Sequence, residues 1–362
     1  MNARQKAVFV GLSALSVSLV AAGGPGPEHG RRLADGTGRM VSVPERPLRI
    51  VSLAPSVTEI LFAVGAGDRV VGVTDFCDTP PEATSLPRIG GMINPDLERI
   101  VGLRPDLVVA STTGNYRDDA ERIERLGIPV FSLHTPTISS ILSAIEQAGD
   151  LAGTRDRAAR LVTDLRRRLD RVVAGAAVRR PRTLFVIEPD PLIVPGRETF
   201  LGEALIMAGA DLVTADAGSA WAQYDLEKVL ALGPEVILTT PANAPWAERL
   251  PGLSKWSKLP AVVGGRVFVV SDSIQHPGPA LVDGIEEVAR ILAEVGKTLE
   301  RNSGGERPPK VGAFPSLPPP LALLAPLPPG IPEIQAGSGS IRGVGLVGIR
   351  KFEPIGRRGC HL

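Results

Sequence analysis

Two aromatic side chains stand where they could contact a ligand instead of filling a core. Only 4% of the residues are aromatic. Trp221 follows a Gly-Ser pair in a predicted loop, off any apolar repeat, and Tyr116 lies in a short segment of glycine, asparagine and arginine. Aromatic residues in such settings suit the recognition of a bulky, partly apolar molecule. The alternatives are a core position for Trp221 and an ordinary surface position for Tyr116.

Two polar residues near the last predicted strand could bind polar groups of the same ligand. Asp272 follows the apolar run 267–270, and His276 precedes a Pro-Gly-Pro sequence. The carboxylate of Asp272 could accept hydrogen bonds from ligand amides or could cap a loop. A solvated surface histidine is the alternative for His276.

No residue pattern indicates catalysis or a structural metal. The chain has no Gly-x-Ser-x-Gly motif, no phosphate-binding glycine loop ending in Lys-Ser or Lys-Thr, and no His-Glu-x-x-His motif. His29 and His361 lie outside the predicted lobes, which leaves His134 and His276. A zinc or manganese receptor needs more histidine and carboxylate ligands than that. We therefore expect a non-enzyme with no metal site and no cofactor.

The N-terminus predicts export. Arg4 and Lys6 precede an apolar run, 7–22, that ends in small residues. This order is typical of a cleaved secretory signal, and a retained anchor is the alternative. The formal net charge of +1 gives no overall field for nucleic acid or an anionic membrane. Cys77 and Cys360 lie in unlike contexts and do not indicate a disulfide framework.

The rest of the chain alternates between strand and helix patterns, which is typical of α/β lobes with mostly parallel sheets. Ser56 and Glu59 have the spacing of a helix-capping box. Two helical stretches interrupt the rhythm, and the second, 155–174, is long enough to join two lobes. Strands are predicted at 48–53, 70–73, 107–110, 129–133, 183–187, 236–239 and 267–270. The other helices are predicted at 56–64, 97–103, 119–126, 138–151, 200–208, 226–232 and 280–295.

The second half of the chain repeats the first. Residues 97–109 match residues 226–238 without a gap, and residues 58–66 match residues 202–210 more weakly. The repeat predicts two similar lobes around the long helix, with a ligand cleft between them. The predicted segments are a signal peptide at 1–22, a linker and edge segment at 23–45, an N-terminal α/β lobe at 46–136, a connecting helical region at 137–177, a C-terminal α/β lobe at 178–300 and a Pro/Gly-rich disordered tail at 301–362.

Four segments resemble the periplasmic cobalamin-binding and ferric-siderophore-binding proteins, which serve ABC importers. They are Asp35-Gly-Thr-Gly-Arg-Met-Val41, Arg49-Ile-Val-Ser-Leu-Ala-Pro-Ser-Val-Thr-Glu59, Asp75-Phe-Cys-Asp-Thr-Pro-Pro-Glu-Ala83 and Asn94-Pro-Asp-Leu-Glu-Arg-Ile100. The resemblance covers roughly residues 35–295. It implies two α/β lobes bridged by one long helix, with little hinge closure.

The resemblance also implies roles for particular residues. Glu98 and Glu227 match glutamates that dock onto arginines of the permease in cobalamin-binding relatives, and they occupy equivalent places in the repeat. The alternative is that each glutamate only complements its helix dipole. Ligand contacts are implied, together with the residues above, for Phe76, Asp78 and Met92.

The function implied is delivery of a cobalamin-like or other corrinoid ligand to the permease of an ABC importer. A haem or ferric-siderophore ligand is the alternative, which Arg117, Arg197 and His276 keep open. The protein is expected to be periplasmic or otherwise secreted and monomeric, and to bind no nucleic acid.

Overall fold

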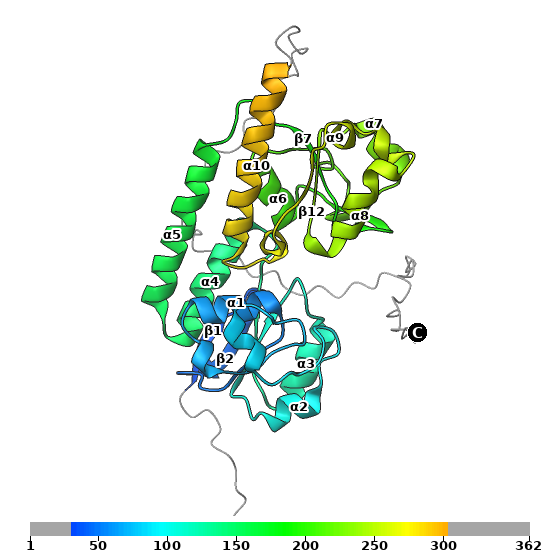
Figure 1. The fold of residues 1–362 in the computed structure, drawn as a ribbon. Coiled ribbons are helices and arrows are strands. Elements are labelled where there is room, and N and C mark those ends of the chain that lie inside the picture. Colours follow the sequence, from blue (N-terminus) through cyan, green and yellow to red (C-terminus); the bar gives the residue numbers. More distant parts are fainter. Residues whose placement is uncertain (1–29, 303–362) are drawn as a thin grey trace, which may run out of the picture. The chain divides into compact units, whose positions relative to one another are not determined.

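The computed structural model describes residues 30–302, which form two α/β lobes and the helices that join them (Figure 1). The predicted signal peptide at 1–22 and residues 303–362 of the predicted tail lie outside the described residues. Within residues 30–302, no helix is both long and apolar enough to cross a membrane.

The N-terminal lobe is built on a parallel sheet of four strands in the order β4-β3-β5-β6. Its strands are β3 (Ile50–Ser52), β4 (Val70–Gly72), β5 (Leu107–Ser111) and β6 (Val130–Leu133). Its helices are α1 (Pro55–Ala63), α2 (Leu97–Gly102) and α3 (Arg117–Arg125). The strand-helix alternation read from the sequence agrees with the parallel pairing of these strands.

The C-terminal lobe has a second parallel sheet, in the order β10-β7-β12-β13, and a small antiparallel sheet, in the order β11-β9-β8. The parallel strands are β7 (Arg182–Phe185), β10 (Asp211–Leu212), β12 (Val236–Thr239) and β13 (Val267–Val269). The antiparallel strands are β8 (Glu188–Pro189), β9 (Leu192–Pro195) and β11 (Trp221–Gln223). The helices are α6 (Phe200–Met207), α7 (Leu226–Leu232), α8 (Ala244–Arg249) and α9 (Pro260–Val263). The small sheet was not predicted, because its strands are too short to show an apolar alternation.

Three helices run along one side of the two lobes: α4 (Ile138–Ala152), α5 (Arg155–Ala174) and α10 (Leu281–Asn302) (Figure 1). The chain turns from α4 into α5 at Gly153, whose φ of 67° lies in the left-handed region that favours glycine. Arg168 of α5 forms ion pairs with Asp283 and Glu286 of α10. The long helix predicted at 155–174 is thus one of three packed helices.

Both sheets bury one face in a single shared core. Side chains alternate across a strand, so Val109 faces that core while its neighbour Val108 faces a separate cluster beneath α2 and α3. In the other lobe Leu238 faces the shared core and Ile237 faces a cluster beneath α7 and α9. The shared core also includes Leu165 of α5, so the same apolar mass holds both lobes and the connecting helices.

The sequence repeat reappears as equivalent hydrogen bonds. Asp96 and Asp225 cap α2 and α7, each accepting from the backbone N–H three residues later, at 3.0 and 2.7 Å. The guanidinium groups of Arg49 and Arg182 donate to the carbonyls of Leu103 and Leu232 at the C-terminal ends of those helices. The next residues, Arg104 and Gly233, both adopt left-handed φ values, 48° and 55°. The two lobes therefore share their capping chemistry as well as their topology.

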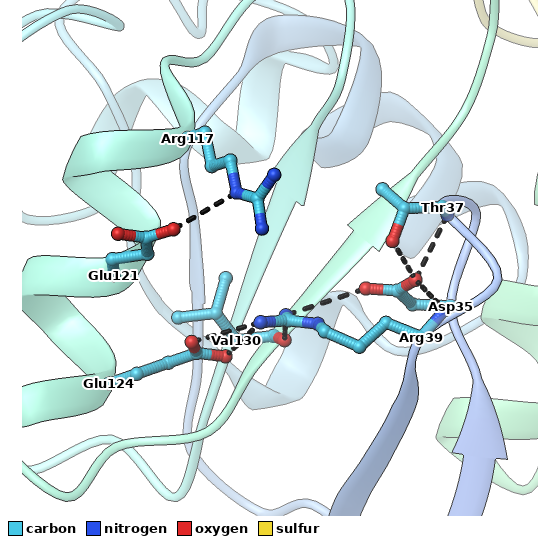
Figure 2. A network of polar contacts seen from close by, with 7 residues as sticks. All are labelled: Asp35, Thr37, Arg39, Arg117, Glu121, Glu124 and Val130. Carbon is cyan, nitrogen blue, oxygen red and sulfur yellow. Dashed lines mark hydrogen bonds and ion pairs between the residues drawn. The ribbon is translucent and has the colours of Figure 1, made fainter. Parts of the chain in front are cut away.

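Residues 30–44, which were predicted as part of a linker and edge segment, form a β-hairpin of β1 (Gly30–Ala34) and β2 (Met40–Pro44). Figure 2 shows how its turn docks on the N-terminal lobe. The carboxylate of Asp35 accepts from the Thr37 N–H, the Thr37 hydroxyl and the Arg39 N–H. Arg39 then binds Glu124 of α3 and the carbonyl of Val130 in β6. The hairpin thereby covers the exposed edge strand of the sheet.

The capping box predicted for Ser56 and Glu59 is wrong. Helix α1 begins at Pro55, after an Ala54 N-cap that makes no side-chain bond. Proline is well suited to this first position because its missing N–H is not needed there. Ser56 is therefore already inside the helix, and Glu59 is used elsewhere.

We predict that Asp35→Ala destabilises the protein by about 1–3 kcal/mol, because three donors lose a buried acceptor. Asp35 is 2% exposed. The melting temperature should fall and amide exchange in residues 30–44 should accelerate. Arg117→Ala is the matched control, since Arg117 forms only an exposed pair with Glu121 in the same view (Figure 2). Equal effects of the two variants would show that the Asp35 network does not anchor the hairpin.

Candidate functional site

Asn115 joins three loops at the carboxyl ends of the N-terminal strands. Its amide donates to the carbonyl of Leu53 after β3 at 2.8 Å, and to the carbonyl of Met92 at 2.9 Å. Its side-chain oxygen accepts from the Ser111 N–H at the end of β5. In open parallel sheets, ligands bind outside this edge. Asn115 is therefore a candidate positioning residue for a binding surface.

Phe76, Met92 and Tyr116 lie on the loops at this edge. The Asp75 N–H donates to the Gly90 carbonyl, which ties the loop that carries Phe76 to the loop that carries Met92. Tyr116 follows Asn115 directly. Phe76 and Tyr116 are 61% and 60% exposed, whereas Met92 packs partly against the shared core. The two aromatic rings are thus held on fixed loops without being buried.

Asp78 lies on the same loop as Phe76 but is engaged with a neighbour. Its carboxylate pairs with Arg88 at 3.2 Å, and Arg88 also donates to the carbonyls of Thr74 and Cys77. No hydrogen bond or ion pair among residues 30–302 joins Asp78 to Asp272. Asp78 supports its own loop in this arrangement.

Trp221 lies in β11, not in a loop as predicted, and it is not a core residue. It pairs with Pro195 of β9 and is 48% exposed. Phe200, at the start of α6, contacts it edge to face with the ring centroids 6.0 Å apart. One side of the indole is thereby supported while much of the ring stays available.

His276 follows a 3-10 turn, η6 (Asp272–Gln275), and contacts the other lobe. Its Nδ1 lies 2.8 Å from Oε1 of Glu59 in α1, and the Glu59 side chain is 5% exposed. The hydrogen bond to Glu59 raises the pKa of His276, burial opposes this effect, and the charges of Glu59 and Asp272 add to it. The histidine is therefore not a free surface residue.

Glu98 and Glu227 occupy the first turns of α2 and α7, and both are exposed. They differ in their surroundings. Glu227 pairs with Lys255, and this contact lowers the pKa of the Glu227 carboxyl. No hydrogen bond or ion pair of Glu98 is found within the described range. Glu98 and Glu227 thus occupy equivalent positions in the repeat but have different partners.

Three residues important for this arrangement were not predicted as site residues: Asn115, Glu59 and Glu203. Glu203 of α6 accepts from the N–H of Ile138 at the start of α4, at 2.8 Å, and burial raises its pKa. The weak repeat between 58–66 and 202–210 already pairs Glu59 with Glu203, but nothing in it shows that Glu59 is buried and Glu203 half-buried. Across residues 30–302, no group of three or more histidine, cysteine, aspartate or glutamate side chains could hold a metal ion.

Comparison with known proteins identifies relatives along most of the chain. The model of the periplasmic binding protein family matches residues 50–273. An uncharacterized ABC transporter substrate-binding lipoprotein of Bacillus subtilis is 32% identical over 268 residues, covering 71% of this chain and 84% of the relative. The vitamin B12-binding protein of Vibrio parahaemolyticus is 29% identical over 254 residues, covering 68% and 90%.

Solved structures agree with the fold. The periplasmic vitamin B12-binding protein of Vibrio cholerae has a TM-score of 0.63 and 26% identity, with 69% of this chain and 98% of that chain covered. The apo periplasmic heme-binding protein of Roseiflexus sp. RS-1 has a TM-score of 0.63 and 25% identity, with 68% and 98% covered. The predicted two-lobe α/β fold with parallel sheets is confirmed.

We predict that Asn115→Ala lowers stability by about 1–3 kcal/mol, because two partly buried carbonyls and one N–H lose their partner. Amide exchange should accelerate in residues 90–94 and 111–116, with smaller changes in the C-terminal lobe. Thr113→Ala, on the same loop, is the control, because its hydroxyl bonds to the hydroxyl groups of Ser111 and Thr135 and, within residues 30–302, to no backbone group of another loop. Unchanged exchange in Asn115→Ala would contradict the positioning role.

Proposed function

Because the chain belongs to the periplasmic binding protein family, we propose that it delivers a cobalamin-like corrinoid to the permease of an ABC importer. The importer couples this delivery to ATP hydrolysis by its own subunits, so the binding protein carries out no reaction. The site of action is the periplasm or another compartment outside the cytoplasm. The relatives named vitamin B12-binding proteins support this ligand class.

The observation that carries the proposal is the exposure of three aromatic rings on rigid supports. Phe76 and Tyr116 lie on the loops joined near Asn115, and Trp221 rests against Phe200. Large aromatic side chains left exposed on a rigid frame are typical of binding surfaces for bulky apolar groups. A corrin ring offers such a face, and its amide side groups suit polar neighbours such as Asp272. We propose that Met92, Asp78 and His276 complete the ligand-binding surface between the lobes.

A haem ligand is the second candidate, because the solved fold relatives include heme-binding proteins. His276 and Tyr116 are the residue types that ligate haem iron. Visible spectra separate the two candidates, since titration with haemin and with cyanocobalamin reports each ligand by its own absorption bands. Saturable binding of haemin but not of cyanocobalamin would replace the first proposal by the second.

Docking to the permease is assigned to Glu98 and Glu227. The two carboxylates lie at equivalent places of the repeat, one per lobe, and each lies at the start of a short exposed helix. Arginine partners could bind them in a bidentate way. Lys255 would have to release Glu227 in that complex, whereas Glu98 is available at once.

We predict that Trp221→Ala weakens cyanocobalamin binding by roughly tenfold to a hundredfold, because burying such a side chain contributes about 1.5–3 kcal/mol. Titration calorimetry measures the change, and ligand quenching of tryptophan fluorescence should largely disappear. Trp246→Phe is the control, since Trp246 packs edge to face on Trp256 inside the C-terminal lobe. Wild-type affinity in a folded Trp221→Ala protein would remove Trp221 from the site.

We predict that Glu98→Ala combined with Glu227→Ala abolishes ligand uptake in reconstituted vesicles while leaving ligand affinity intact. Either single variant should give a partial defect, because the other lobe still docks, and arginine at both positions should be worse through repulsion. Glu121→Ala removes an exposed carboxylate from α3 and is the control. If the glutamates only complement helix dipoles, the double variant loses a little stability and transports normally.

A further inference from the structure

Two glutamates at equivalent positions of the repeat each reach outside their own lobe. Glu59 lies in α1 and Glu203 lies in α6, so they belong to different lobes. Glu59 accepts from His276, which follows the last strand of the C-terminal lobe. Glu203 accepts from the N–H of Ile138, where the chain leaves the N-terminal lobe. The two carboxylates therefore form a related pair of contacts at the junction of the lobes.

The buried Glu59 carboxylate favours a cationic partner. Its side chain is 5% exposed, and its second oxygen, Oε2, is buried without a hydrogen-bond partner. Gly278 packs against this oxygen so closely that a Cβ there would lie 3.1 Å away. A buried carboxylate without a countercharge is strongly unfavourable. His276 is the group that can supply this charge.

The other charged groups near the pair do not replace His276. A cavity of about 410 Å³ between α1, α5 and α10 touches Glu59 and is lined by further acids and one base. That base, Arg168, is already paired with Glu286 and Asp283 of α10. The remaining charged groups near the pair are acidic. Glu82 in the loop after β4, Asp164 of α5 and Asp283 of α10 line the cavity. The charge of Asp272 in η6 acts on His276.

We propose that Glu59 and His276 form a proton-operated clasp between the two lobes, strong when the imidazole is cationic and weaker when it is neutral. The clasp goes beyond ligand transport, because it acts in the ligand-free protein. One third of the His276 side chain is exposed, so protons can exchange with the solvent. Acid conditions tighten the junction, and alkaline conditions loosen it.

The direction follows from the pKa of His276, which the hydrogen bond to Glu59 raises above the ordinary value of 6.5 against the opposing effect of burial. A histidine whose pKa is higher in the folded than in the unfolded chain adds stability below the unfolded value. That stability is lost as the pH rises through the folded pKa. The clasp therefore contributes most below about pH 6.5 and least well above the raised pKa.

The test uses the full chain without ligand. At pH 6 the wild type should melt about 2–4 °C above His276→Gln, the shift typical for one lost charged contact in a protein of this size. The difference should shrink markedly by pH 8.5. In a Glu59→Gln background, His276→Gln should have the same effect at both pH values. In a Glu203→Gln background, the pH dependence should remain, which makes that variant the matched control.

Two further measurements use only the wild-type protein, so they do not depend on whether a variant folds. Proton NMR of the His276 imidazole should give a titration midpoint above 6.5. Amide-exchange protection in α1 and at the start of α10, corrected for the intrinsic exchange rate, should decrease together as the pH rises through that midpoint. An unchanged melting difference at pH 6 and 8.5, or a pH dependence that persists in the Glu59→Gln background, would overturn the clasp.

Discussion

The structure depends on one shared apolar core that packs both lobes against the same helices. A sheet buried on both faces normally belongs to one layered domain. Here each sheet gives one face to its own lobe and the other to the common core, which α4, α5 and α10 also enter. A large rotation of one lobe would expose part of that core to water, which is costly. This constraint explains why the connecting region consists of packed helices and not of a flexible strand pair.

Polar groups at the junction are the exceptions within this apolar frame. Glu59 is buried and Glu203 is half-buried, and each is compensated by a group that comes from outside its lobe. Because a buried carboxylate tolerates little displacement of its partner, these contacts set the relative placement of α1, α6 and the segments that cross between the lobes. Thr79 and Pro80, which follow Asp78 of the proposed ligand-binding surface, line the same cavity as Glu59.

The two halves of the repeat are more alike in their helix-capping hydrogen bonds than in the partners of their exposed residues. Asp96 and Asp225 cap equivalent helices, and Arg49 and Arg182 bind equivalent carbonyls. These bonds satisfy helix ends that would otherwise lack partners, so they are required in each lobe separately. The exposed glutamates two residues after the caps, Glu98 and Glu227, are not the capping residues of these helices. Their surroundings differ, because Lys255 pairs with Glu227. In the proposed permease complex, the two equivalent carboxylates would therefore differ in how readily they bind.

The α/β class, most of the long elements, the repeat and the family resemblance can all be predicted from the sequence. These follow from local apolar periodicity and short motifs, which are properties of neighbouring residues. The sequence also indicates Trp221 and Tyr116 as candidate ligand-binding residues, because an aromatic residue that lies outside an apolar repeat can be recognised from the sequence alone. The tertiary structure alone decided that 30–44 is a docked hairpin, that Trp221 lies on a short strand and that Asn115 joins three loops. It also decided the partner of Glu59: a capping box was the local expectation, but His276, 217 residues away, supplies the charge that burial demands. Burial and countercharge depend on contacts between distant segments, and no local pattern of residues encodes them.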